Sequence, residues 1–345
     1  MTDIDNLVRN SVRSLIPYSC ARDDFRGKDG IFMDANENPY GYLNRYPDPY
    51  QQELKSGISR IKEIPAENIF LGNGSDEIID LCFRVFCNPG IDKALTFTPT
   101  YGMYEVSAAI NNVELIKVPL SEDFQIEIKK LSPFLESPNL KLIFICSPNN
   151  PTGNAMNGTV VETIIKKFSG IVVIDEAYID FAEPQHLSIK ALTRRYNNLI
   201  VMQTFSKAMG LAAARIGMAF MDSQIVHYFN KMKPPYNISS INQKAALNCL
   251  KHVELLKKRV RMIKTERERL SAVLKKMSII EKVFPSDSNF LLVKTKDADL
   301  IYSGLVENKI ITRNRNKIVP GCIRITVGTK SENNRLIKAL NSINL

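Results

Sequence analysis

The segment IVVIDEAY, residues 171–178, is the clearest indication of the fold class, because it is an uninterrupted apolar run followed by two carboxylates. A continuous apolar run without polar alternation is typical of a strand buried on both faces of a sheet. Residues 94–97, 142–145 and 199–202 form similar runs, and stretches of helical character, such as 76–86 and 160–168, alternate with them. This alternation predicts an α/β fold with a mostly parallel central sheet and helices on both faces.

Polar clusters follow three of the expected strands. Residues 147–151 (SPNNP) follow the first, Asp175 and Glu176 close the second, and residues 204–207 (TFSK) close the third. In open parallel sheets, ligands bind beyond the carboxyl ends of the strands. The sequence therefore predicts a ligand crevice formed by these three segments.

The pattern changes at about Asn237, where a long helix, strands near residues 289–293 and 323–327, and a final helix follow. A chain of 345 residues exceeds the length at which a single core usually stops growing. Near the start, Arg9, Arg13, Arg22 and Arg26 occur with weak periodicity, as in an arm that docks elsewhere. We expect an arm at residues 1–30, a large domain at 31–236 and a small C-terminal α+β domain at 237–345.

The composition is that of an ordinary globular protein, with 44% hydrophobic and 24% charged residues. The formal charge of +10 suits either anionic substrates or nucleic acid. Much of the excess lies in residues 251–276, where apolar residues recur at helical spacing and no aromatic residues interleave with the charges. This pattern predicts an amphipathic helix with a solvated basic face and disfavours a nucleic-acid partner.

The six cysteines form no C-x-x-C pair, and no His and Cys cluster has zinc spacing, so we expect reduced thiols and no metal. The first ten residues contain no apolar leader segment, and no later run is long enough to span a bilayer. We therefore expect a cytoplasmic protein without a membrane partner.

Groups of complementary chemistry gather at the expected crevice. Lys207 follows a buried strand, where desolvation would lower the pKa of its amine, and Asp175 ends a neighbouring strand. Residues 72–76 (GNGSD) lie between a strand and a helix and would form an anion seat from backbone N–H groups. Taken singly, each has an ordinary explanation as a turn, a helix cap or a surface lysine. A dinucleotide fingerprint is disfavoured, because Glu77 stands where its third glycine belongs.

Several sequence words occur together in register over nearly the whole chain. They are residues 36–39 (NENP), 45–47 (RYP), 72–77 (GNGSDE), 99–104 (PTYGMY), 147–153 (SPNNPTG), 175–178 (DEAY) and 324–328 (RITVG). With Asn150, Asp175, Lys207 and Arg215 in this order, the chain resembles fold type I aminotransferases of the histidinol-phosphate aminotransferase family.

The resemblance implies pyridoxal 5'-phosphate as cofactor, held by Lys207 as an imine, with Asp175 on the pyridine nitrogen. Lys207 would also act as general base, and Asp175 and Tyr178 complete the implied catalytic set. Asn150 and Tyr178 would contact the phenolic oxygen, and Tyr101 would stack on the ring. The implied phosphate group consists of Gly74, Ser75, Asp76, Thr204, Ser206 and Arg215, with Tyr46 from the partner subunit.

The same resemblance implies the substrates histidinol phosphate and glutamate or 2-oxoglutarate, and thus a step of histidine biosynthesis. Arg324 resembles the family's carboxylate-binding arginine, while Arg313, Tyr18 and Asn150 match substrate positions. A contribution of Tyr46 to the partner's site implies a symmetric homodimer with shared sites.

Other activities share these motifs. An aromatic amino acid aminotransferase and a threonine-phosphate decarboxylase of the same family remain alternatives, and a non-catalytic basic nucleic-acid-binding protein is a remote one. The chain departs from the family where Ala212 follows Gly210 and Leu211, since the family usually has another glycine there. The methyl group is tolerated unless that position needs a positive φ.

Overall fold

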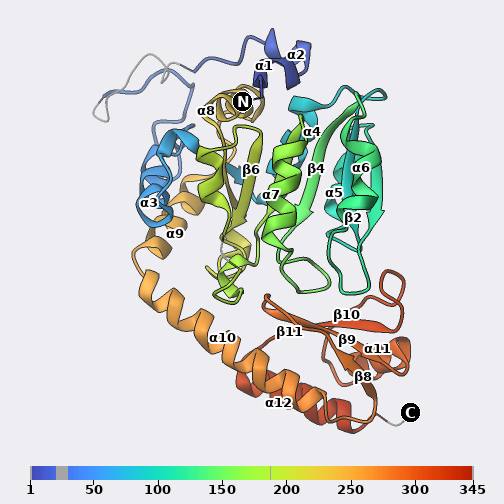
Figure 1. Ribbon diagram of the computed structural model, residues 1–345. Coiled ribbons are helices and arrows are strands. Elements are labelled where there is room, and N and C mark those ends of the chain that lie inside the picture. Colours follow the sequence, from blue (N-terminus) through green and yellow to red (C-terminus); the bar gives the residue numbers. More distant parts are fainter. Residues whose placement is uncertain (1, 21–29, 187, 344–345) are drawn as a thin grey trace.

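A computed structural model of the protein describes residues 2–20, 30–186 and 188–343. Its larger sheet has seven strands in the order β1-β7-β6-β5-β4-β2-β3 (Figure 1). Strand β7 alone runs against its neighbours in this sheet. The strands are β1 (Ile69–Asn73), β2 (Lys93–Thr98), β3 (Glu114–Pro119), β4 (Leu140–Cys146), β5 (Ile171–Asp175), β6 (Leu199–Thr204) and β7 (Ile216–Phe220).

Helices cover both faces of this sheet and form two cores. One face packs on α3 (Gln52–Lys62), α6 (Ile128–Leu135) and α7 (Gly158–Lys167). The other face packs on α4 (Ser75–Phe86), α5 (Met103–Ile110) and α8 (Ser223–Met232), with apolar residues of α1 (Ile4–Leu7) and α2 (Asn10–Arg13) joining the same core. Short 3-10 helices connect the elements: η2 (Ala66–Asn68), η3 (Ile179–Phe181), η4 (Lys190–Arg194) and η5 (Ala212–Ala214).

Side chains alternate between the two faces of the sheet along each strand, and this determines on which face the polar side chain at a strand end lies. In β5, Ile171 and Val173 belong to the α4 and α5 side, whereas Val172 and Ile174 belong to the α3 and α7 side. Because side chains alternate along a strand, Asp175 falls on the α4 and α5 side. By the same count in β6, Thr204 falls on the α4 and α5 side and Gln203 on the opposite one.

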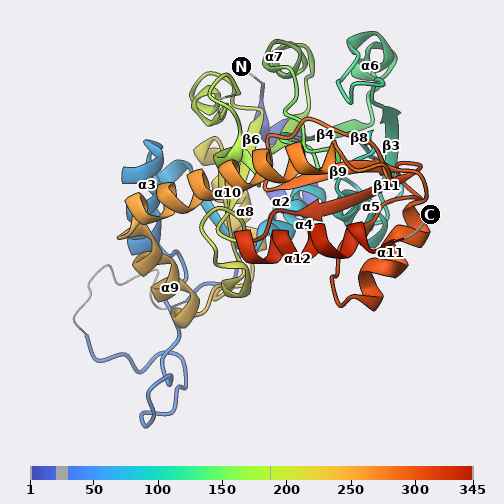
Figure 2. The same cartoon turned by 90° about the horizontal axis from the view of Figure 1, so that it is seen from below.

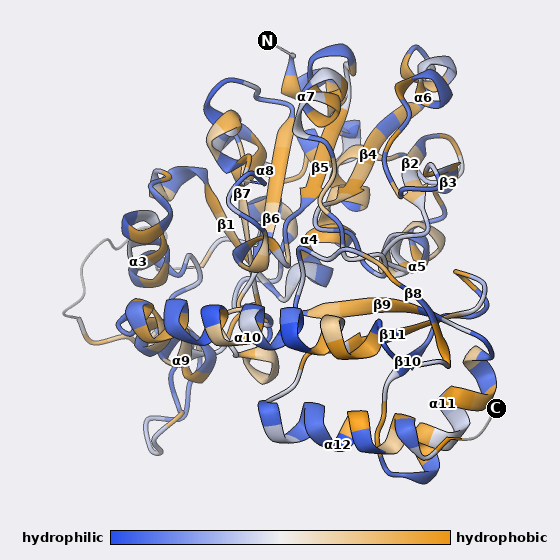
Figure 3. Cartoon of the chain, turned by 60° about the horizontal axis from the view of Figure 1, so that its bottom comes forward, coloured by the Kyte–Doolittle hydropathy of each residue, from blue (hydrophilic) through white to orange (hydrophobic). Residues whose placement is uncertain are grey.

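The smaller sheet is antiparallel, in the order β10-β11-β9-β8, and lies beyond the carboxyl ends of the large sheet's parallel strands (Figures 1 and 2). Its strands are β8 (Ile280–Val283), β9 (Phe290–Thr295), β10 (Arg313–Asn314) and β11 (Cys322–Thr326). Its outer face packs on α10 (Val253–Leu274), α11 (Ala298–Glu307) and α12 (Lys330–Asn341). Figure 3 shows hydrophilic residues along much of α10 and α12 and apolar strands in the large sheet.

The structure confirms the predicted fold class and the predicted amphipathic helix, which is α10. All six cysteines are free, five of them buried, as expected. Helix α9 (Ser240–Leu250) packs on α3, and its Ala246 belongs to the core of the large sheet. A domain division at residue 237 remains our proposal, and part of the arm, residues 21–29, lies outside the described residues.

Candidate active site

Asp175 is a buried carboxylate with few partners. It ends β5, is 3% exposed, and accepts hydrogen bonds from the Tyr104 hydroxyl (2.9 Å to Oδ2) and the Ala177 N–H (3.0 Å to Oδ1). Burial raises the pKa of Asp175, and these two hydrogen bonds only partly offset that effect. A nearby cation would relieve the cost of keeping this carboxylate ionised.

Lys207 lies in the loop between β6 and β7, with its Nζ 5.5 Å from the centroid of the Tyr178 ring. No described residue accepts a hydrogen bond from this amine. Desolvation lowers the pKa of Lys207, and the positive charge of Arg324 lowers it further, whereas Asp175 and Asp76 act in the opposite direction. A lowered pKa increases the neutral fraction of the amine, which is its nucleophilic form.

The loop before α4, for which the sequence predicts an anion seat, has a close-packed geometry built on two glycines. Gly74 has φ +80°, and a Cβ built on it would come within 2.5 Å of Arg215 Nη2. A Cβ on Gly217 of β7 would lie 2.4 Å from the backbone N of Ser75. Two glycines thus let Arg215 and β7 approach the N-terminus of α4, where free N–H groups and the helix dipole favour an anion.

Charged and hydroxyl side chains border this seat. Arg215 Nη2 lies 3.3 Å from Asp76 Oδ2, and Tyr101 donates to Asp76 Oδ1 at 3.0 Å. Thr204 Oγ1 accepts from the Ser206 N–H at 3.1 Å, which holds the loop before Lys207. Gly74, Ser75, Asp76 and Arg215 therefore lie together at this loop, and Thr204 lies near them because it pairs with Gly217.

Strand β11 of the smaller sheet contributes Arg324 to the same site. Its Nη1 donates to Asn150 Oδ1 at 2.5 Å, and its guanidinium carbon lies 5.1 Å from the centroid of the Phe290 ring. Phe290 in turn packs edge-on against Tyr178, with centroids 5.1 Å apart. These contacts join the strand ends of the large sheet to β9 and β11.

The structure does not bring every predicted residue together. Tyr18 is 76% exposed, and no described residue forms a hydrogen bond or ring contact with it. Tyr46 is half-exposed and stacks on Tyr236, with centroids 4.4 Å apart. Its position is fixed by Glu37, which accepts from the Tyr46 N–H and pairs with Arg45, so two of the quoted sequence words are tied together. Arg313 is exposed at the edge of the small sheet, directly opposite Arg324.

Two residues of the site were missed by the sequence reasoning. Tyr104 lies within a quoted word, and its hydroxyl reaches Asp175 from the first turn of α5, whereas Tyr101 precedes this helix; a second tyrosine in the same word was the only signal in the sequence. Arg315 lies two residues after Arg313, and strand alternation was the signal that both point the same way. The question about Ala212 is answered, because Ala212 lies in η5 and the positive φ falls at Gly210 and Arg215 instead.

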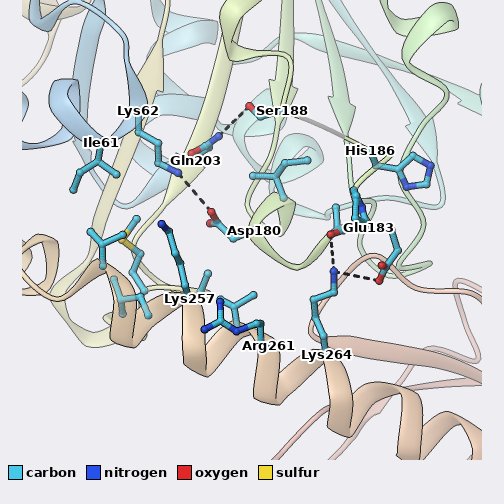
Figure 4. A pocket seen from close by; sticks show the side chains of 18 of the residues that line it. Ile61, Lys62, Asp180, Glu183, His186, Ser188, Gln203, Lys257, Arg261 and Lys264 are labelled. Atoms are coloured by element: carbon cyan, nitrogen blue, oxygen red, sulfur yellow. Dashed lines mark hydrogen bonds and ion pairs between the residues drawn. The ribbon is translucent and has the colours of Figure 1, made fainter.

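A cavity of about 560 Å³ lies on the other side of the Lys207 loop, between that loop and α10 (Figure 4). Its lining includes Gln203, Ala208 and Met209, but not Lys207, Asp175 or Tyr178. Alternation in β6 explains this separation, since Gln203 and Thr204 point to opposite faces. The cavity is therefore distinct from the site that contains Lys207.

Within the described ranges, no group of three or more His, Cys, Asp and Glu side chains could hold a metal ion. In the same ranges, no helix combines the length and the apolar character that crossing a bilayer requires.

A buried carboxylate, a reactive amine and an anion seat at the carboxyl end of a parallel sheet are the site features of pyridoxal-phosphate transferases. Residues 33–340 match the family model for aminotransferase class I and II, and the chain belongs to that family. Its relatives include histidinol-phosphate aminotransferases from Cytophaga hutchinsonii, 48% identical over 98% of both chains, and from Bacteroides thetaiotaomicron, 47% identical over 99% of both.

Solved structures agree with the fold. The histidinol-phosphate aminotransferase from Clostridium acetobutylicum has a TM-score of 0.80 at 25% identity and covers 87% of this chain and 91% of its own. The enzyme from Sinorhizobium meliloti, in complex with pyridoxal-5'-phosphate, has a TM-score of 0.80 at 24% identity, with 90% of each chain covered. The predicted family and its transaminase class are thereby confirmed.

Proposed function

We propose that this protein is a pyridoxal-phosphate-dependent aminotransferase that converts L-histidinol phosphate and 2-oxoglutarate to imidazole acetol phosphate and L-glutamate. The observation that carries the proposal is full-length similarity, at 47–48% identity, to relatives named for histidinol phosphate. The unneutralised guanidinium of Arg324 beside Lys207 supports an anionic substrate at this position.

The residues present fit the cofactor. Lys207 would hold it covalently, and Asp175 would pair with its ring nitrogen, which supplies the cation that the buried carboxylate lacks. Asn150 and Tyr178 would contact the phenolic oxygen, with Tyr101 against the ring. Its phosphate would lie at the N-terminus of α4, where Gly74 and Gly217 let Arg215 and β7 come close to the backbone of Ser75. The rest of the proposed phosphate group is Ser75, Asp76, Thr204, Ser206 and Arg215, with Tyr46 contributed by a second copy of the chain.

When bound, pyridoxal 5'-phosphate supplies an electron sink for the bonds to the substrate Cα. Lys207 Nζ would take the proton from the substrate Cα, and its lowered pKa increases the fraction of neutral amine that can act as a base. With the cofactor bound, the Asp175 carboxylate would stabilise positive charge at the ring nitrogen. Arg324 orients the substrate through a carboxylate or phosphate, and its stacking on Phe290 and its bond to Asn150 fix the direction of the guanidinium.

We propose a symmetric homodimer in the cytoplasm. The half-exposed Tyr46 and the exposed Tyr18 support a dimer, because both have surface left for a second chain. Arg313 and Tyr18 would then approach the phosphate of histidinol phosphate. The proposed dimer is tested by sedimentation of the purified protein, which should give twice the monomer mass of 39.0 kDa.

The substrate proposal is tested by a side-by-side assay of the purified enzyme with cofactor. Histidinol phosphate, phenylalanine, tyrosine and threonine phosphate are supplied at equal concentration with 2-oxoglutarate, and glutamate and carbon dioxide are measured. We expect glutamate formation to be fastest with histidinol phosphate and no carbon dioxide to form. Comparable rates with phenylalanine or tyrosine would indicate an aromatic aminotransferase. Carbon dioxide released from threonine phosphate without use of 2-oxoglutarate would indicate a decarboxylase.

After desolvation, the positive charge of Arg324 is the next cause of the lowered pKa of Lys207, so it should affect how cofactor attachment depends on pH. Because Arg324 lowers the pKa of Lys207, the variant Arg324→Gln should raise that pKa toward the ordinary value and reduce the neutral amine at a given pH. The rate at which cofactor-free protein attaches the cofactor should therefore follow a profile shifted to higher pH. Absorbance of the attached cofactor, followed across the pH range, measures the shift. An unshifted profile would show that Arg324 does not act on this amine.

A further inference from the structure

Three arginines share one face of the small sheet. Arg313 of β10 pairs directly with Arg324 of β11, and the Arg315 N–H donates to the Cys322 carbonyl at 2.9 Å, which extends the same ladder. Because side chains alternate, Arg313, Arg315 and Arg324 point to one face. Asn314, between them, points the other way and donates to Asp299 of α11 at 2.6 Å. The arginine face is thus the one that carries Phe290 and meets Tyr178.

The three guanidinium groups lack a neutralising partner. Among the described residues, no carboxylate lies within 4.0 Å of Arg313, Arg315 or Arg324. The Nε atoms of Arg315 and Arg324 are both buried without a hydrogen-bond partner in these ranges. Leaving buried charged donors unsatisfied is costly, so the cluster is arranged for an anion that arrives from outside.

The electrostatics of Arg315 agree with this arrangement. Desolvation and then the charges of Arg324 and Arg313 lower the pKa of Arg315 to about 10, while Tyr178 acts in the opposite direction. Burial raises the pKa of Tyr178, and the positive charge of Arg315 is among those that oppose this effect. The Tyr178 ring itself lies beside the Lys207 amine. Arg315 therefore belongs to the site and not to the outer surface, unlike the exposed Lys317 two residues later.

We propose that Arg315 is a specificity-determining residue that binds the phosphate monoester of the amino donor and favours it over a carboxylate. The inference rests on the proposed function and names the residue that selects the phosphate. A phosphate monoester carries nearly two negative charges at neutral pH and offers three acceptor oxygens, whereas a carboxylate carries one charge. A third guanidinium accordingly stabilises the phosphate substrate more than glutamate, for which Arg324 suffices.

Steady-state kinetics of Arg315→Gln test the proposal. We expect KM for histidinol phosphate to rise about tenfold or more, as for the loss of a charge-assisted hydrogen bond. KM for glutamate in the reverse direction should rise by no more than about threefold, because Arg324 still binds the carboxylate and only the more distant positive charge of Arg315 is lost. Arg315→Lys, which keeps the charge but loses the planar fork, should fall between the two.

The matched control is Lys317→Gln, which removes one positive charge from the same loop at an exposed position and should leave both KM values unchanged. Thermal unfolding of each variant checks that the fold is intact. Equal KM changes for the two substrates in Arg315→Gln, or no change in either, would overturn the proposal.

A second measurement separates this inference from the proposed substrate. Inorganic phosphate is used as a competitor of glutamate, which requires no histidinol phosphate. Weaker inhibition of Arg315→Gln than of the natural protein and Lys317→Gln supports a phosphate subsite even if histidinol phosphate is not turned over. Equal inhibition of all three proteins, with histidinol phosphate still turned over by the natural one, would remove Arg315 from the subsite and leave the proposed function standing.

Discussion

Replacing Lys207 with alanine should lower transaminase turnover by roughly 10³-fold or more, because this one side chain is proposed to supply both the covalent attachment and the general base. Desolvation and the positive charges of Arg324 and Arg215 lower the pKa of this amine, whereas Asp175 and Asp76 act in the opposite direction. Steady-state turnover with histidinol phosphate, measured at saturating cofactor, gives the effect. Saturation ensures that weaker cofactor binding does not account for the loss.

The control for this variant is Lys257→Ala, which removes an exposed lysine of α10 paired with Glu254 and should retain full turnover. Borohydride reduction followed by peptide mass analysis provides a second readout. Reduction should fix the cofactor on the peptide that contains Lys207 in the natural protein and in Lys257→Ala, and on no peptide in Lys207→Ala. Full turnover of Lys207→Ala would disprove the assigned role.

Asp175→Asn should reduce turnover by roughly 100-fold or more, which is the scale for losing one preorganised electrostatic partner in a water-excluded site. The substitution preserves shape and removes only the negative charge that is proposed to hold the ring nitrogen cationic. Turnover and cofactor affinity are both measured, and both should fall. Asp180→Asn is the matched control, since Asp180 is an exposed acid that pairs with Lys62 at 3.6 Å.

In the protein without cofactor, the same variant should not lower the thermal stability. Burial raises the pKa of Asp175, so the folded state holds this proton more tightly than the unfolded chain does. The stability that this carboxyl contributes is present below its ordinary pKa and is lost as the pH rises through the raised value. An asparagine at this position does not ionise, so the variant Asp175→Asn does not lose this stability as the pH rises. The melting temperature of the cofactor-free variant at neutral pH should therefore equal or exceed that of the natural protein. A clear decrease would mean that Asp175 is needed for folding itself.

Much of the large domain could be predicted from the sequence, because its central strands are buried on both faces and therefore read as continuous apolar runs. The direction of β7 could not, since Ile216–Phe220 is as apolar as its parallel neighbours and hydrophobicity carries no information on strand direction. The edge strand β3 is only partly buried, so its pattern is mixed and gives a weak signal. Strand β10 is two residues long and has no pattern of its own.

The site divides in a similar way. Asp175, Lys207 and the glycine loop could be predicted because each directly adjoins a strand with a clear apolar signal. Tyr104 could not be assigned a partner, because its contact with Asp175 spans 71 positions in sequence and depends on how α5 packs. Arg315 was missed because its face depends on the register between β10 and β11. The functional roles of all these residues stay predictions, and the role of Tyr46 also requires a second chain.

The reversed strand β7 has a consequence for exchanging parts between relatives. Since β6 and β7 form a hairpin, the chain leaves the sheet after Thr204 and returns at Ile216 on the same edge, with Lys207 and Arg215 on one excursion. The lysine proposed to anchor the cofactor and the arginine proposed to bind its phosphate are therefore inherited together in one segment of the chain. Chimeras with crossovers outside residues 204–216 should keep the pair matched, whereas a crossover inside this segment would join an amine and a guanidinium from two differently shaped loops.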